Sequence, residues 1–246
     1  MESFKDIAPF YDVLMQGVPY KMWANYYYLL LSHHHLHPEK LLDVCCGTGT
    51  LSEIFTKENF KVTGFDLSAS MIDEARKKAK KHQLDIQYHV QDATCFELGQ
   101  KFDGAYSFFD SLNYILEPED LAQTFHQVAK HLVAGGSFIF DLNTAYAFET
   151  KLFDQSDLDP EEEVKYQWRG DYDPQSLQIK VKMEFWYQGH YFFEEHRQRA
   201  HPEFEVKSLL RRAGFGEIKV YDSYTLDRAK KRSDRVHYVA KLKKLE

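Results

Sequence analysis

Short apolar runs alternate with longer amphipathic segments through the first part of the chain. After each run, apolar side chains recur at the three- and four-residue spacing of a helix, as at Met71, Ile72, Ala75 and Ala79. Strands and helices that alternate in this way form a parallel sheet with helices on both faces. The predicted strands are residues 41–44, 61–65, 86–90, 102–109 and 137–140.

The spacing of apolar positions changes to two beyond the fifth predicted strand. Over residues 179–187, apolar side chains alternate with lysine, glutamate and tryptophan, which is the pattern of a strand with one buried face. Turn-forming residues at 173–174 and 188–190 flank this strand. We therefore predict a three-stranded antiparallel meander over residues 163–201, preceded by a solvated acidic loop over residues 154–163.

The helix-and-strand pattern returns near the C-terminus, with a helix predicted over residues 203–213 and strands near 215–221 and 235–242. Together with the first part, this gives an α/β fold: a doubly wound, mostly parallel, seven-stranded sheet with an inserted three-stranded antiparallel sheet. We divide the chain into N-terminal helices (residues 1–38), a core (residues 39–142 and 202–246) and an insert (residues 143–201).

The composition excludes several classes of protein. The chain of 246 residues is 43% hydrophobic and 15% aromatic, which is enough for a sizeable core. Its net charge of −7 argues against a protein built around nucleic-acid phosphates. No apolar run approaches the roughly 20 residues of a membrane span, and the N-terminus has no signal-peptide pattern. Of three cysteines, Cys45 and Cys46 are adjacent, so a disulfide framework is not expected. We expect a soluble, cytoplasmic protein without a membrane partner.

The loop after the first predicted strand has the features of a ligand-binding turn. Gly47 and Gly49 lie in this loop, and glycine leaves the backbone N–H groups open to a ligand. Asp66 ends the next strand, 66 − 47 = 19 positions after Gly47. An acid near that spacing can accept hydrogen bonds from both ribose hydroxyls of an adenosine ligand. A tight turn with a helix-capping Asp66 is the alternative, which the strand–loop–helix–strand context disfavours.

Charge favours one adenosine ligand over another. Ser52 stands where a pyrophosphate-binding loop prefers a third glycine. Asp43, just before the loop, would repel a pyrophosphate, but it would attract the ammonium group of S-adenosylmethionine or a water bound to it. The electrostatics therefore favour S-adenosylmethionine over NAD, and a methyltransferase over a dehydrogenase.

These segments resemble the motifs of class I S-adenosylmethionine-dependent methyltransferases, which have a Rossmann-like fold. Residues 41–49 are similar to the first motif of that family, 65–71 to the second and 91–93 to the third. Further runs, at residues 11–12, 19–23 and 194–200, resemble a group of small bacterial methyltransferases related to methyltransferase domain 25, whose substrates are largely unassigned. Cys45 and Thr50 depart from the pattern, because many members have glycine at these positions.

The resemblance implies a role for each cofactor-binding candidate. Asp43 and the glycine loop would hold the methionine part, Asp66 the ribose, and Asp92 with the Ala93 N–H the adenine edge. Aromatic residues of the N-terminal helices would close over the cofactor, where a ring near the sulfonium gives a cation–π contact. A purely structural helix stripe is the open alternative for Tyr20 and Trp23. The candidates are Tyr11, Tyr20, Trp23, Asp43, Cys45, Gly47, Gly49, Asp66, Leu67, Met71, Asp92, Ala93 and Phe109.

Catalysis by such a protein would depend mainly on alignment. Orientation and water exclusion supply roughly 7–11 kcal/mol, and a base is needed only if the acceptor must lose a proton. The candidates facing the methyl group are Asp110, Asn113, Tyr114 and His196. The insert would then form a lid that selects the acceptor.

A histidine cluster and two basic runs raise two further possibilities, a metal site and an RNA substrate. The histidines at 33–37 have no acidic or cysteine partners at a suitable spacing, so no metal site is expected. Basic runs at 76–81 and 228–231 are typical of solvated helix faces, although they leave an RNA substrate open. We expect a small-molecule acceptor and a monomer or homodimer. The alternatives are an RNA methyltransferase and a non-catalytic protein that binds S-adenosylmethionine or S-adenosylhomocysteine.

Overall fold

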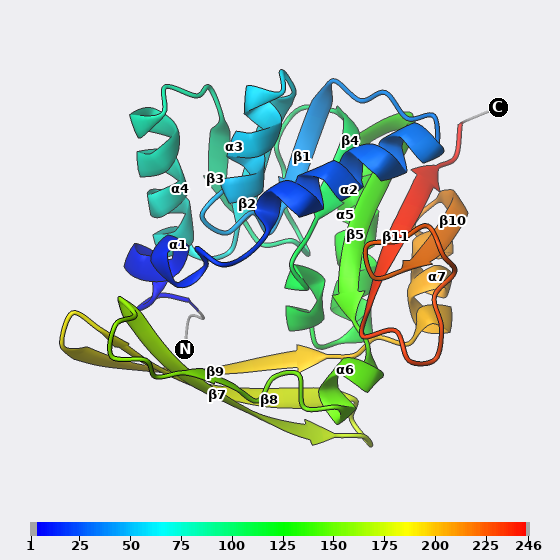
Figure 1. Ribbon diagram of the computed structural model, residues 1–246. Coiled ribbons are helices and arrows are strands. Elements are labelled where there is room, and N and C mark those ends of the chain that lie inside the picture. Colours follow the sequence, from blue (N-terminus) through cyan, green and yellow to red (C-terminus); the bar gives the residue numbers. More distant parts are fainter. Residues whose placement is uncertain (1–3, 245–246) are drawn as a thin grey trace.

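The computed structural model describes residues 4–244, which form two sheets, the larger one covered by helices (Figure 1). The larger sheet has the order β10-β11-β5-β4-β1-β2-β3. Its central strands pair in parallel, while β5, β11 and β10 pair antiparallel at one edge. The predicted seven-stranded, mostly parallel sheet is therefore confirmed. Its strands are β1 (Lys40–Val44), β2 (Lys61–Asp66), β3 (Gln87–Val90), β4 (Phe102–Ser107), β5 (Leu132–Asn143), β10 (Phe215–Asp222) and β11 (Arg235–Leu242).

Helices cover both faces of this sheet. On one face Tyr27, Phe55 and Tyr106 are fully buried together, and on the other Phe125 packs against Phe138. No helix within the described residues is long and apolar enough to cross a membrane. The helices of the first face are α2 (Tyr20–His33), α3 (Thr50–Lys57) and α4 (Ala69–Lys81), and those of the second are α5 (Pro118–His131) and α7 (Glu203–Arg212).

The sequence of α5 shows how local chemistry sets a helix. Pro118 begins it, where the missing N–H of proline removes no intrahelical hydrogen bond. Glu119 and Asp120 lie in the first turn and Lys130 in the last, so each charge opposes the helix dipole. The apolar stripe of this helix faces the sheet and is buried.

The insert is a four-stranded antiparallel sheet of order β6-β7-β8-β9, which lies across the carboxyl ends of the parallel strands (Figure 1). The three predicted strands are present, and a short fourth strand adds to their edge within the acidic segment predicted to be a loop. The side chains of this fourth strand are mainly exposed, because a strand at an edge needs only backbone hydrogen bonds to join the sheet. Without buried apolar side chains at a spacing of two, the sequence pattern did not predict the strand. The strands are β6 (Gln155–Asp157), β7 (Val164–Asp173), β8 (Gln178–Tyr187) and β9 (His190–Arg199), preceded by α6 (Ala145–Glu149).

The N-terminal segment connects the insert to the core. Its short helices are η1 (Ala8–Phe10) and α1 (Tyr11–Leu14). The ring of Phe10 stacks on Tyr187 of the insert at a centroid distance of 4.8 Å. On the other side, Asp12 accepts hydrogen bonds from Thr48 Oγ1 and Lys78 Nζ, both at 2.6 Å. The segment is therefore held both to the insert and to the glycine loop.

Candidate active site

A cavity of about 1040 Å³ lies between the carboxyl ends of the parallel strands and the antiparallel sheet. Ligands of doubly wound sheets bind at this end of the strands. Most of the predicted site residues line it: Tyr11, Cys45, Gly47, Asp66, Leu67, Met71, Asp92, Ala93, Phe109, Asp110 and Tyr114. The predicted Asn113 does not, but it accepts a hydrogen bond from Asn143, which lines the cavity. Tyr20, Trp23, Asp43, Gly49 and His196 lie behind the wall of the cavity.

The two glycines of the loop have different surroundings: Gly47 is accessible, and Gly49 is packed against a neighbouring side chain. Gly47 adopts φ +54°, and a Cβ there would have no neighbour within 4 Å, so its backbone is accessible to a ligand. Gly49 also has positive φ, but its Cβ would lie 2.2 Å from the hydroxyl of Tyr88, so packing rather than a ligand requires glycine. Cys45 has φ +61°, a left-handed conformation that costs a non-glycine residue roughly 1–2 kcal/mol.

The carboxylate of Asp66 is held in a fixed orientation at the end of β2. It accepts hydrogen bonds from the backbone N–H groups of Gly47 and Ser68, both at 2.9 Å. Burial raises the pKa of Asp66, and these bonds oppose that effect. The side chain therefore presents an oriented acceptor to the cavity, which suits the hydroxyls of a ribose.

One end of the cavity, where the resemblance would place the adenine, is formed by the start of α4 and by the loop after β3. Met71 of α4 is buried and contributes an apolar surface, and Ala93 contributes backbone. Asp92 is exposed and accepts hydrogen bonds from the backbone N–H and hydroxyl of Thr94, at 2.8 and 2.7 Å. Leu67 is 65% exposed at the mouth of the cavity. These residues fit one flat ring, with apolar contact on its face and polar groups at its edge.

Asp43 lies one layer behind the cavity. One of its oxygens accepts hydrogen bonds from Ser52 Oγ at 2.6 Å and from the Tyr106 hydroxyl at 2.8 Å. Burial raises its pKa to about 7, and the nearby Asp66 adds to this shift. Ser52, which stands where pyrophosphate-binding loops prefer glycine, thus has a structural role as a donor to Asp43.

We expect S-adenosylmethionine binding to release a proton near neutral pH. With a pKa of about 7, Asp43 is about half protonated at pH 7 in the free protein. The cofactor ammonium favours the carboxylate, so affinity should rise between pH 5 and 7 and level off above about pH 8. Calorimetry in two buffers with different ionisation enthalpies measures the released proton.

Asp43→Asn is the matched control for this prediction, because the amide oxygen can still accept from Ser52 and Tyr106. The variant should bind more weakly and without this proton release. The pH dependence of folding stability should also differ between the variant and the wild type. A folded pKa above the unfolded value means that wild-type stability is lost as pH rises towards 7, and the variant should lack that loss. Equal proton release by both proteins would contradict the assignment.

The N-terminal aromatic residues separate into two groups. Tyr11 lines the cavity, and its ring meets that of Phe4 at 5.9 Å. Trp23 is 6% exposed and belongs to the core of α2, with its ring 5.2 Å from Tyr20 and 4.9 Å from Phe109. Tyr20 and Trp23 are not among the residues that line the cavity, and their contact with the cofactor, expected from the resemblance, stays a prediction. Their helix packs behind Phe109, which does line the cavity.

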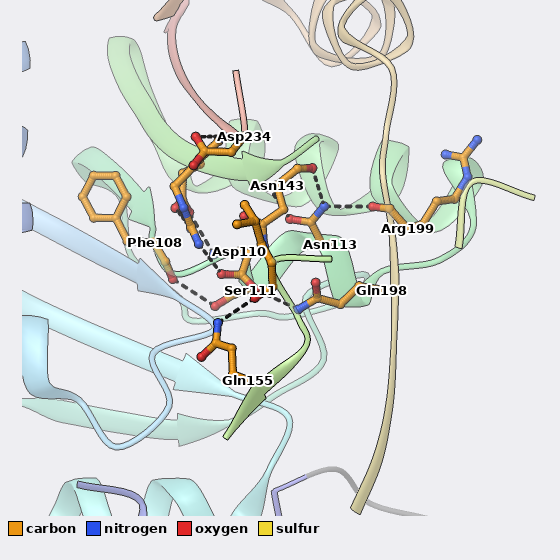
Figure 2. A network of polar contacts seen from close by, with 12 residues as sticks. Phe108, Asp110, Ser111, Asn113, Asn143, Gln155, Gln198, Arg199 and Asp234 are labelled. Carbon is orange, nitrogen blue, oxygen red and sulfur yellow. Dashed lines mark hydrogen bonds and ion pairs between the residues drawn. The ribbon is translucent and has the colours of Figure 1, made fainter. Parts of the chain in front are cut away.

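Asp110 is part of a charged network at the end of β4. Its carboxylate pairs with Arg235 at 2.8 Å and accepts from Gln198 Nε2 at 2.7 Å, and Arg235 also pairs with Asp141 (Figure 2). Each oxygen of Asp110 therefore already has a partner. Phe109 and Asp110 both have positive φ, so the turn that presents them is strained. We assign Asp110 to positioning.

The side chain of Asn113 holds neighbouring backbone segments together. Its amide nitrogen donates to the backbone oxygens of Asn143 at 3.0 Å and Arg199 at 2.9 Å, while its oxygen accepts from the Asn143 N–H (Figure 2). It therefore ties η2 (Ser111–Tyr114) to β5 and to the end of the insert.

Tyr114 and His196 form a chain of hydrogen bonds that leads away from the cavity. The Tyr114 hydroxyl lies 2.9 Å from Nδ1 of His196, which is 1% exposed. Nε2 of His196 lies 2.5 Å from Oε2 of Glu194, and this oxygen also accepts from the Phe4 N–H at 2.9 Å. An oxygen that already accepts from a backbone N–H favours a proton on Nε2, which leaves Nδ1 to accept from Tyr114.

Several of these residues were not predicted from the sequence. Glu194 had a usable signal, because residues 194, 196 and 198 share one face of a strand that has a period of two. Arg235, Asp141 and Gln198 had none, because they come together only through the pairing of β5 with β11 and the approach of β9.

Comparisons with known proteins identify related methyltransferases. The profile of the Methyltransferase domain family matches residues 41–136. A Geobacillus sp. (strain WCH70) protein predicted to be a methyltransferase is 33% identical over 97% of this chain and 99% of its own. A Streptomyces venezuelae enzyme, dTDP-3-amino-3,4,6-trideoxy-alpha-D-glucopyranose N,N-dimethyltransferase, is 36% identical over 55% of this chain and 56% of its own.

A solved structure extends the similarity to the insert. An S-adenosylmethionine-dependent methyltransferase from Clostridium acetobutylicum superimposes with a TM-score of 0.85 and 28% identity, over 98% of this chain and all of that one. The glycine loop, the oriented Asp66 and the cavity at the carboxyl ends of the strands fit the same cofactor. The chain therefore belongs to the methyltransferase domain family and is an S-adenosylmethionine-dependent methyltransferase.

Proposed function

We propose that this methyltransferase acts on a small-molecule acceptor held between the core and the insert. The observation that carries the proposal is one continuous cavity lined both by cofactor-binding candidates and by the insert residues Trp168, Met183 and Phe185. Its volume of about 1040 Å³ is at the upper end of ordinary ligand pockets. There is room for the cofactor and a compact acceptor together, and the insert supplies the wall that distinguishes acceptors.

The chain's residues divide into those that hold the cofactor and those that face the acceptor. Asp66 would hold the ribose, and Asp92 with Ala93 the adenine edge. The glycine loop, with Asp43 behind it, would hold the methionine part, and Tyr11 would close over the cofactor. When bound, S-adenosylmethionine supplies an activated methyl group, so the protein's main task is orientation and exclusion of water. The N-terminal segment would do both, because it closes one side of the cavity and is held to the glycine loop through Asp12.

Tyr114 is the group that we assign to accepting the acceptor's proton. The Tyr114 side chain lines the cavity, and its hydroxyl proton can pass to Nδ1 of His196, where Glu194 would stabilise the resulting imidazolium. Tyr114 is thus the catalytic residue, while His196 and Glu194 are positioning residues behind it. Asp110, which is paired with Arg235, is excluded from this role.

Thermal unfolding with S-adenosylmethionine, S-adenosylhomocysteine or NADH tests the cofactor assignment. A ligand at about 100 times its dissociation constant adds roughly 2.7 kcal/mol of stability, a shift of several degrees for a chain of this size. We expect a shift with the first two ligands and none with NADH. Transfer of radiolabelled methyl to a panel of ring-containing amines, phenols and an amino-sugar nucleotide then tests the reaction. Tight binding with no turnover on any acceptor would instead support a non-catalytic binding protein.

A further inference from the structure

The acceptor half of the cavity has an aromatic and apolar wall. Its apolar lining comes from the inner face of the insert, from the segment after α6 and from the N-terminal segment. Such a wall binds the flat or cyclic apolar part of a ligand by burial and ring contacts. Phe4, Phe153 and Trp168 are partly exposed in this wall, and Ile7, Met183 and Phe185 are buried in the layer that supports it.

Two polar groups in this wall lack a partner among residues 4–244. They are the indole N–H of Trp168 and the side-chain oxygen of Gln198. The amide of Gln198 has a defined orientation, because its nitrogen donates to Asp110 and a carboxylate can only accept. An unsatisfied buried polar group is unfavourable by roughly 1–3 kcal/mol. Both atoms are buried from solvent, so a ligand reaches them only when neighbouring side chains shift, and it would then bring one acceptor to Trp168 and one N–H or O–H to Gln198.

The charges of the cavity disfavour an anionic acceptor. Two arginines line it within the described residues, and no lysine does. Arg235 is already paired with Asp110 and Asp141, and Arg197 lies 3.7 Å from Glu195. The acidic lining residues are Asp66, Asp92, Asp110, Glu195 and Asp234. Of the two arginines, Arg197 stays available to a phosphate because its contact with Glu195 is long and exposed, but the five lining carboxylates outnumber it, and an ammonium group would find both carboxylates and aromatic faces.

We infer that the acceptor is a neutral or cationic ring compound that carries an amino or hydroxyl nucleophile, and not a nucleotide-linked sugar. The inference rests on the proposed function. The amino-sugar relative acts on a dTDP-linked substrate, which is a diphosphate. Its similarity covers about half of this chain, so the relative does not fix the acceptor here, and the insert of this protein provides an apolar wall instead of a diphosphate site.

The test is calorimetric binding to the protein saturated with S-adenosylhomocysteine. The probes are tyramine, tryptamine and cyclohexylamine, with dTDP-glucose as the anionic probe. We expect at least one ring amine to bind at least tenfold more tightly than dTDP-glucose. Trp168→Phe, which keeps the ring and loses the N–H, should weaken tyramine binding about fivefold. Trp186→Phe is the matched control, because Trp186 lies outside the cavity lining on the other face of β8.

Glu195→Lys is a second variant that leaves the wall intact. It adds positive charge at the cavity, so it should strengthen dTDP-glucose binding relative to tyramine. Tighter binding of dTDP-glucose than of every ring amine by the wild-type protein would overturn the inference, as would binding of none of the ring amines. Equal tyramine affinity in Trp168→Phe and wild type would also contradict it. Failure to bind S-adenosylhomocysteine at all would instead count against the proposed function.

Discussion

Asp66→Ala is expected to weaken S-adenosylmethionine binding by about 100-fold or more without unfolding the protein. A hydrogen bond to a charged group contributes roughly 1.5–3 kcal/mol, and each 1.4 kcal/mol is a factor of about ten in affinity. Asp66 would accept two ribose hydroxyls, and its carboxylate also fixes the loop through the Gly47 N–H. The dissociation constant from calorimetry measures the loss, and the thermal midpoint of circular dichroism reports the fold.

Two variants control this result. Asp66→Asn keeps one acceptor oxygen and the shape of the side chain, so it should lose about tenfold in affinity. Asp73→Ala removes a carboxylate that is 64% exposed on α4, and its affinity should match that of the wild type. If Asp66→Ala bound within threefold of the wild type, the ribose would have to lie elsewhere. A matching loss in thermal stability and in affinity would assign Asp66 to the fold instead.

The larger sheet could be predicted from sequence because its signals are local. Strands such as β1 are short and mainly apolar, and helices such as α5 carry a regular apolar stripe with charged residues at the ends that suit the helix dipole. The glycine loop and Asp66 follow from the order of these elements. The short strand β6 could not be predicted, because its backbone pairs at an edge and its side chains carry no periodic pattern.

The aromatic and charged parts of the site were harder to place for a different reason. A stripe on α2 has the same spacing whether it faces a ligand or the core, so sequence alone could not place Trp23 behind Phe109. The network of Asp110, Asp141 and Arg235 depends on strands that are distant in the chain and adjacent in the sheet. Because both oxygens of Asp110 have partners in this network, we propose Tyr114 as the base instead.

His196→Gln is expected to lower kcat about 100-fold at pH 7 for an acceptor that must lose a proton, with the affinity for S-adenosylhomocysteine unchanged. Removal of a general base or its proton acceptor commonly lowers rates by roughly 10²–10⁴-fold. Glutamine can still contact the Tyr114 hydroxyl but cannot take its proton at neutral pH. Tyr114→Phe, which removes the hydroxyl in contact with His196, should lose at least as much.

The pH dependence distinguishes proton transfer from simple positioning. Alkyl ammonium and phenol groups have pKa values of about 10, so as pH approaches 9.5 a growing fraction of the acceptor arrives already deprotonated. The deficit of His196→Gln relative to the wild type should therefore narrow from about 100-fold at pH 7 to about tenfold at pH 9.5. His82→Gln is the matched control, because His82 contacts Glu53 at 2.9 Å without lining the cavity. A deficit that stays constant with pH would mean that His196 only holds Tyr114 in place, since the loss of a steric or hydrogen-bonding support does not depend on the protonation state of the acceptor.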